Sequence, residues 1–77
     1  MNETFRQLIA DKLRLIRIEK KDRIEDLALK TGIAPSTISR YESGKYDMTI
    51  DKLEQLLKPY NISLYIFFEN INAKTHN

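Results

Sequence analysis

The side chains best suited to chemistry lie in the stretch TGIAPSTISRYESGKY, which contains both glycines of the chain and one of its two prolines. A guanidinium can donate two parallel hydrogen bonds to O6 and N7 of guanine, and small hydroxyl side chains let a backbone approach base edges closely. A short helix with such a polar face therefore predicts contacts with DNA bases. Four residues after the proline supply these groups: Ser36, Thr37, Ser39 and Arg40.

Catalytic chemistry has little support in the sequence. The only histidine, His76, is the penultimate residue, and the chain has no cysteine. No pair of carboxylates lies beside a base, a nucleophile or a metal ligand. The acidic residues at positions 22, 25 and 26 are explained as the cap and first turn of a helix. We therefore expect no enzyme activity, no metal site and no cofactor.

Composition limits the size, location and partners of the protein. Its 77 residues predict one domain, spanning 1–77, of modest stability. The absence of cysteine, of a signal-peptide pattern and of an apolar run of roughly 18 residues predicts a cytoplasmic protein with no membrane partner. Net charge is only +2, but seven basic and three acidic residues lie between Arg6 and Arg23, which favours a polyanionic partner near this end. From charge alone, a solvated helix face is the simpler explanation.

The elements that must position the polar stretch are helices. Asp22 is suited to cap a second helix, with Glu25 three positions later in a capping box, and Gly32 is suited to end it. A first helix precedes it, because apolar residues recur there at spacings of three and four. The members of that apolar stripe are Phe5, Leu8, Ile9, Leu13 and Ile16.

A third helix carries the polar residues. Pro35 is suited to its first position and Gly44 to its end, and a fourth helix follows, with Thr49 as the N-cap candidate and Pro59 at its close. Two short helices joined by a tight, glycine-containing turn have the layout of a helix-turn-helix, whose second helix enters the major groove of DNA. The helix-turn-helix core then spans 23–44. Two residues of the third helix are expected to face inward: Ile38 and Tyr41.

The segment NISLYIFFENI near the C-terminus is ambiguous. Its apolar and polar residues alternate and it is rich in β-branched and aromatic types, which favours a strand. A helix with Ser63 as its N-cap remains open. We expect the segment 62–71 to pair across a homodimer, with cover for the core of one monomer as the alternative. The dimerisation residues would be Leu64, Tyr65, Ile66, Phe67 and Phe68.

The stretch IEDLALKTGIAPSTISRYESGKYDMTIDKLEQLLKPYNIS resembles the Xre/Cro-like helix-turn-helix domain of phage repressors and bacterial regulators. The elements that carry the resemblance are "LA", "TG", "STISRYESGK" and "TIDKLEQLL", and it covers roughly residues 13–63. It implies an all-α, compact lambda-repressor-like bundle of four or five helices that binds operator DNA as a symmetric homodimer. It also implies a structural ion pair between Arg17 and Glu42, which would not read bases.

The resemblance also implies a set of DNA contacts. Many relatives carry glutamine at the positions of Ile24 and Pro35, where it anchors a phosphate and reads a base respectively. Arg23 is expected to replace the lost phosphate anchor, and specificity to depend on Arg40 and on DNA shape. Base contacts fall on Ser36, Ser39 and Arg40. Backbone contacts fall on Arg23, Pro35, Thr37, Lys45 and Tyr46.

Together these features predict a sequence-specific transcriptional regulator of double-stranded DNA, most simply an autoregulatory repressor that binds a palindromic operator as a homodimer. The C-terminal segment is similar to that of HipB-type antitoxins, in which a strand pairs across the dimer. One alternative is therefore an antitoxin that neutralises a toxin protein and co-represses its operon. A phage Cro-like switch and a restriction-modification controller are further alternatives of the same size.

Overall fold

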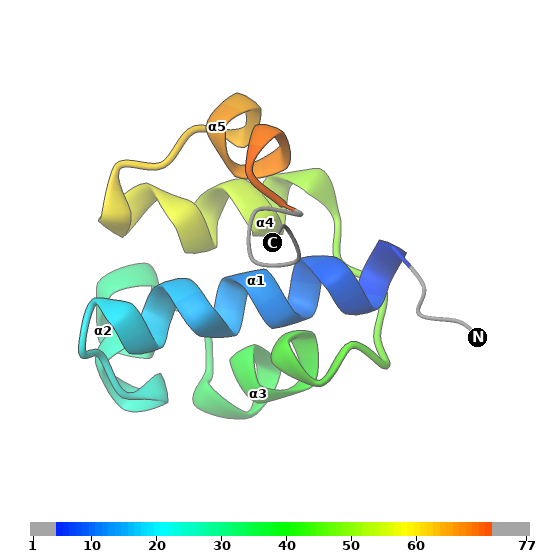
Figure 1. Ribbon diagram of the computed structural model, residues 1–77. Helices are drawn as coiled ribbons and strands as arrows, with labels where there is room; N and C mark the ends of the chain where they lie inside the picture. The colour runs from blue at the N-terminus through cyan, green and yellow to red at the C-terminus, as the bar shows by residue number, and fades with distance from the viewer. Residues whose placement is uncertain (1–4, 72–77) are drawn as a thin grey trace.

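The computed structural model describes residues 5–71, and within them all regular structure is helical (Figure 1). This confirms the predicted all-α fold, while the penultimate residue, His76, lies outside the described part. Helix α3 packs against both α1 and α2, and α5 packs against α4. The elements are α1 (Phe5–Glu19), α2 (Ile24–Thr31), α3 (Pro35–Ser43), α4 (Ile50–Leu57), the 3₁₀ turn η1 (Lys58–Tyr60) and α5 (Leu64–Glu69).

One hydrophobic core joins the helices. The stripe predicted on α1 supplies Leu13 and Ile16, and the residue that anchors α3, Ile38, is fully buried. Burial of these side chains is the main force that holds the short helices together, because helices of eight or nine residues are marginal on their own. The other buried members of the core are Leu27, Ile33, Leu53, Leu56, Leu57, Phe67 and Ile71.

The glycine, proline and threonine residues at the boundaries of α2, α3 and α4 have the roles that the sequence predicts. Gly32 and Gly44 adopt φ values of 77° and 79°, the left-handed region that a helix C-terminus needs and glycine adopts without steric cost. Pro35 occupies the first position of α3. The Thr49 hydroxyl caps α4 by accepting a hydrogen bond of 3.1 Å from the backbone N–H of Lys52.

The predicted cap of α2 is wrong by one residue. Arg23, not Asp22, is the N-cap, and its backbone N–H donates to the Asp26 carboxylate at 2.8 Å. Asp26 thus has the position in the first turn that the prediction gave to Glu25. The Asp22 carboxylate is unavailable for capping because it accepts hydrogen bonds from Lys30 and Tyr60.

The predicted C-terminal strand is also wrong, because residues 64–69 form helix α5. The Ser63 hydroxyl caps it by accepting from the backbone N–H of Ile66 at 3.1 Å, as in the alternative left open above. The physical reason is a second apolar pattern, at spacings of three and four, that coexists with the alternation of period two. Residues on this helical stripe are buried or half-buried, namely Leu64, Phe67, Phe68 and Ile71.

Candidate nucleic-acid interface

Helix α3 presents its polar residues outward. Ser36, Ser39 and Arg40 are exposed, whereas Thr37 is half-buried. Ile38 anchors the opposite side, as predicted. Exposed serine and arginine side chains on a helix that is fixed from behind can meet base edges without any rearrangement of the core. The structure therefore brings together the three residues that the sequence assigned to base contacts.

A buried ion pair fixes the orientation of α3. Arg17 on α1 donates two hydrogen bonds to the Glu42 carboxylate, from Nε at 2.8 Å and from Nη2 at 2.9 Å. The two side chains are only 10% and 7% exposed, and the Glu42 bond raises the pKa of Arg17. Arg17 Nη1 also donates to the carbonyl of Asp22 at 2.8 Å. One guanidinium thus joins the end of α3 to the turn before α2, which confirms the structural pair that the resemblance implied.

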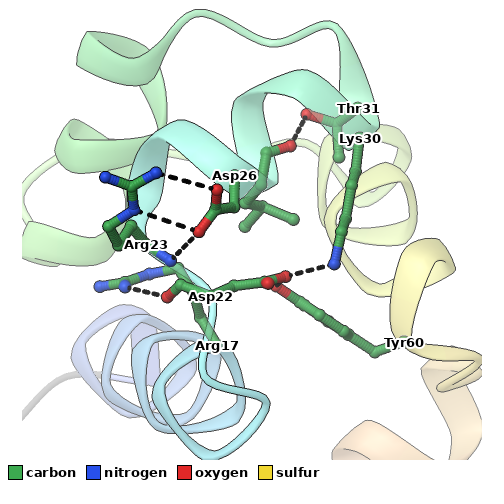
Figure 2. Close-up of polar contacts among 8 residues, drawn as sticks. Arg17, Asp22, Arg23, Asp26, Lys30, Thr31 and Tyr60 are labelled. Carbon is green, nitrogen blue, oxygen red and sulfur yellow. Dashed lines mark hydrogen bonds and ion pairs between the residues drawn. The ribbon is translucent and has the colours of Figure 1, made fainter.

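Asp22 is the centre of a second polar cluster, shown in Figure 2, that the sequence did not reveal. Its carboxylate accepts from Lys30 Nζ at 2.7 Å and from the Tyr60 hydroxyl at 2.8 Å. These bonds hold the pKa of Asp22 below its ordinary value, while burial and the same carboxylate raise the pKa of Tyr60. The cluster joins α2 to the turn after α4. The separation of 38 residues between Asp22 and Tyr60 leaves no local sequence signal for it.

Arg23, a predicted phosphate contact, lies at the start of α2 and is exposed. Its guanidinium contacts the Asp26 carboxylate through Nε and Nη2, each at 3.3 Å, as Figure 2 shows. This pair is solvent-exposed, so its strength is modest and decreases with salt. Arg23 therefore lies at the N-terminus of α2, the first helix of the helix-turn-helix, and the Asp26 carboxylate is already beside it.

The loop after α3 carries the two other charged or aromatic candidates for backbone contact. Lys45 and Tyr46 are both exposed in this loop. The guanidinium carbon of Arg40 lies 5.7 Å from the centroid of the Tyr46 ring, which is the geometry of a cation–π contact. Tyr46 and Arg40 are thus neighbours, although the sequence had assigned them separate roles. Pro35, the remaining candidate, is exposed at the first position of α3.

The candidate dimerisation residues divide into two groups. Phe67 is 1% exposed and packs edge-on against Phe68, and Leu64 and Phe68 are half-buried against the core, so a single chain accounts for these three. Tyr65 and Ile66 are 71% and 45% exposed and lie on the outer side of α5. These two residues are the members of the predicted set that are available at the surface.

The comparison with protein families decides the affiliation. The helix-turn-helix family matches residues 13–67, which include all of α2, α3 and α4. The chain belongs to the Xre/Cro-like helix-turn-helix family. The comparison with curated proteins returns no match.

Among solved structures, the chain is similar to the restriction-modification controller protein C.Esp1396I. The tetramer of that protein in complex with its natural 35 base-pair operator shares 32% sequence identity and a TM-score of 0.83, covering 94% of this chain and 96% of that chain. A tyrosine-to-phenylalanine variant of the same protein gives 29% identity and a TM-score of 0.84, covering 97% and 95%. An arginine-to-alanine variant of that protein gives 31% sequence identity and a TM-score of 0.82, covering 96% of this chain and 100% of that chain.

Other kinds of site find no support in the part of the chain that the structure describes. Residues 5–71 contain no group of three or more His, Cys, Asp or Glu side chains that could hold a metal ion. None of the helices in the same range is long and apolar enough to cross a membrane.

Proposed function

We propose that this protein is a sequence-specific transcriptional regulator that binds a palindromic DNA operator as a homodimer. The observation that carries the proposal is the exposed row of Ser36, Ser39 and Arg40 on a helix fixed by the Arg17–Glu42 pair. The affiliation with the helix-turn-helix family supports it, as does the similarity to a controller protein in complex with its operator. In this function the protein works in the cytoplasm and carries out no catalysis.

Base contacts and phosphate contacts are assigned to different parts of the interface. The N-terminus of α3 enters the major groove, where Ser36, Ser39 and Arg40 contact base edges. Phosphate contacts then position the domain without reading sequence. These contacts come from Arg23 at the start of α2, from Thr37 in the first turn of α3, and from Lys45 and Tyr46 after it. Pro35 lies beside the sugar-phosphate backbone at the start of α3 and donates no hydrogen bond to it.

The dimer surface is proposed on α5. Tyr65 and Ile66 are exposed there, and an aromatic ring beside a β-branched side chain is a typical hydrophobic contact between subunits. A symmetric dimer requires two half-sites about one helical turn apart on the DNA. A second dimer on an adjacent site would give a tetramer on one operator, the assembly described for the controller protein.

Among the alternative regulators, the restriction-modification controller is favoured. The antitoxin reading depended on a C-terminal strand, and the segment forms α5 instead. The solved structures that resemble the chain over nearly its full length are of a controller protein. The neighbouring genes test this choice: a methyltransferase and endonuclease pair supports the controller, and a toxin gene with a co-purifying product contradicts it.

Selection of bound sites from random double-stranded DNA tests the function itself. We expect a palindrome with one preferred spacing, and failure to enrich any sequence would contradict the proposal. Arg40→Ala should reduce affinity for the selected site by about tenfold to a hundredfold and leave affinity for random DNA nearly unchanged.

Arg23→Ala is the matched control, because it removes the same side chain from a backbone-contact position. It should weaken both complexes equally and make the salt dependence shallower by about one unit of slope. Equal losses on both DNAs for Arg40→Ala would remove it from the base-reading set. An unchanged salt slope for Arg23→Ala would remove that residue from the phosphate set.

A further inference from the structure

The first turn of α1 is bound to the loop between α3 and α4. Arg6 Nη1 donates to the Lys45 carbonyl at 3.2 Å, and Arg6 Nε lies 3.3 Å from the Asp47 carboxylate. The next residue, Gln7, presses its carboxamide against Gly44, where an added Cβ would collide with it. Figure 1 shows this loop passing the N-terminal end of α1. These two α1 residues precede the stretch 13–67 that matches the family.

The loop held in this way carries part of the proposed DNA interface. Lys45 and Tyr46 are its phosphate-contact candidates, and the Tyr46 ring faces the Arg40 guanidinium at 5.7 Å. A cation–π contact restricts where an otherwise mobile arginine side chain lies. Displacement of the loop therefore moves the aromatic surface against which Arg40 is held.

The contact combines a hydrogen bond to the backbone, an ion pair and the packing of Gln7. Asp47 is 92% exposed on its side chain, and an ion pair in such a setting is weak. The Lys45 carbonyl belongs to the loop backbone itself, so a bond to it acts directly on the loop, and Gly44 beside it is a buried position against which Gln7 packs. The same first turn and loop also line an apolar groove that includes Phe5 and Met48.

We propose that Arg6 is a positioning residue for DNA recognition, which clamps the α3–α4 loop so that Tyr46 holds Arg40 in its base-reading position. Arg6 acts through the loop and contacts no base itself. Each contact is exposed and weak alone, so the restraint depends on one guanidinium making both at once, from Nη1 to the Lys45 carbonyl and from Nε to Asp47. Lysine has a single compact ammonium group and does not reproduce this bridge. The effect of Arg6 on DNA affinity rests on the proposed function, whereas the contact between Arg6 and the loop does not.

The test compares Arg6→Ala, Arg6→Lys and a control, Arg14→Ala, which removes an exposed arginine from the same helix. Amide hydrogen exchange in the free protein measures the mobility of the loop, through the Gly44 and Lys45 amides that donate to the Tyr41 carbonyl and the Ser43 hydroxyl. Dissociation constants for the selected operator and for random duplex DNA, each at several salt concentrations, measure its consequence. Thermal unfolding of each variant verifies that it is folded at the assay temperature.

We expect faster exchange at the Gly44 and Lys45 amides in Arg6→Ala and Arg6→Lys, and unchanged exchange in Arg14→Ala. Both Arg6 variants should lose about threefold to tenfold in operator affinity, the scale typical of a residue that acts through others, with little change on random DNA. The salt slope of Arg6→Lys should equal that of the wild type, because its charge is kept.

Three results would overturn the inference. Unchanged loop exchange would mean that Arg6 does not hold the loop. Wild-type operator affinity in Arg6→Lys would mean that only its charge matters. Equal losses on both DNAs in Arg6→Ala, with a salt slope shallower by about one, would make Arg6 a direct phosphate contact. If the wild type selects no DNA, the proposed function fails, and the exchange data alone decide whether Arg6 holds the loop.

Discussion

Removal of Arg17 should destabilise this domain severely, because it leaves the Glu42 carboxylate buried without its cation. Both side chains are at least nine-tenths buried, and the pair makes two hydrogen bonds shorter than 3 Å. Loss of one partner of such a buried pair costs about 3–5 kcal/mol. A domain of this length has a total stability of about 4–12 kcal/mol. Arg17→Met should therefore lower the unfolding midpoint by roughly 12–40 °C.

A double variant distinguishes the lone charge from lost packing. In Arg17→Met/Glu42→Leu the uncompensated carboxylate is gone, so we expect recovery of at least about 2 kcal/mol relative to Arg17→Met. Complete recovery is not expected, because the Asp22 carbonyl still lacks its donor. Urea unfolding at one fixed protein concentration measures all three proteins, since dimerisation makes apparent stability depend on concentration. A double variant no more stable than Arg17→Met would refute the argument from an uncompensated charge.

Three further predictions concern the polar cluster and α5. Tyr60→Phe should cost about 1–2 kcal/mol in urea unfolding, because Asp22 loses a donor at 2.8 Å; an unchanged midpoint would contradict this. The folded-state pKa of Asp22 is lowered from the ordinary 3.8, so its contribution is present above that pH and lost as pH falls below it. Asp22→Asn should therefore lose less unfolding free energy than the wild type as pH falls below about 4. The same loss in both proteins would count against the cluster. Ser63→Ala should cost about 1 kcal/mol, whereas a strand at this position would show no such loss.

The helix-turn-helix core could be predicted from sequence because local rules determine its boundaries. Gly32, Pro35, Gly44 and Thr49 each have a conformational or capping role that does not depend on distant residues, and each is found where expected. The C-terminal segment differs because its apolar residues fit periods of both two and three to four. The core decides between them, since a helix buries Phe67 and leaves Tyr65 outside.

The polar contacts between helices could not be predicted from local sequence rules. Asp22 satisfies every local requirement for an N-cap, yet Lys30 and Tyr60 reach it from two other elements and Asp26 serves the helix start instead. The contact of Arg6 with the loop after α3 likewise joins residues 39 positions apart. Such bonds depend on how the helices pack, which the order of residues along one helix does not reveal.

Two replacements at the proposed interface increase the importance of Arg40. Ile24 has a hydrocarbon side chain that is half-buried and offers no donor to a phosphate, and Pro35 has neither a side-chain donor nor a backbone N–H. Arg40 is then the one long, charged side chain among the proposed base contacts. A single flexible arginine discriminates bases well only if its position is restricted, and the Tyr46 ring restricts it. We therefore expect specificity to depend on the position of the loop that carries Tyr46 as well as on the residues of α3.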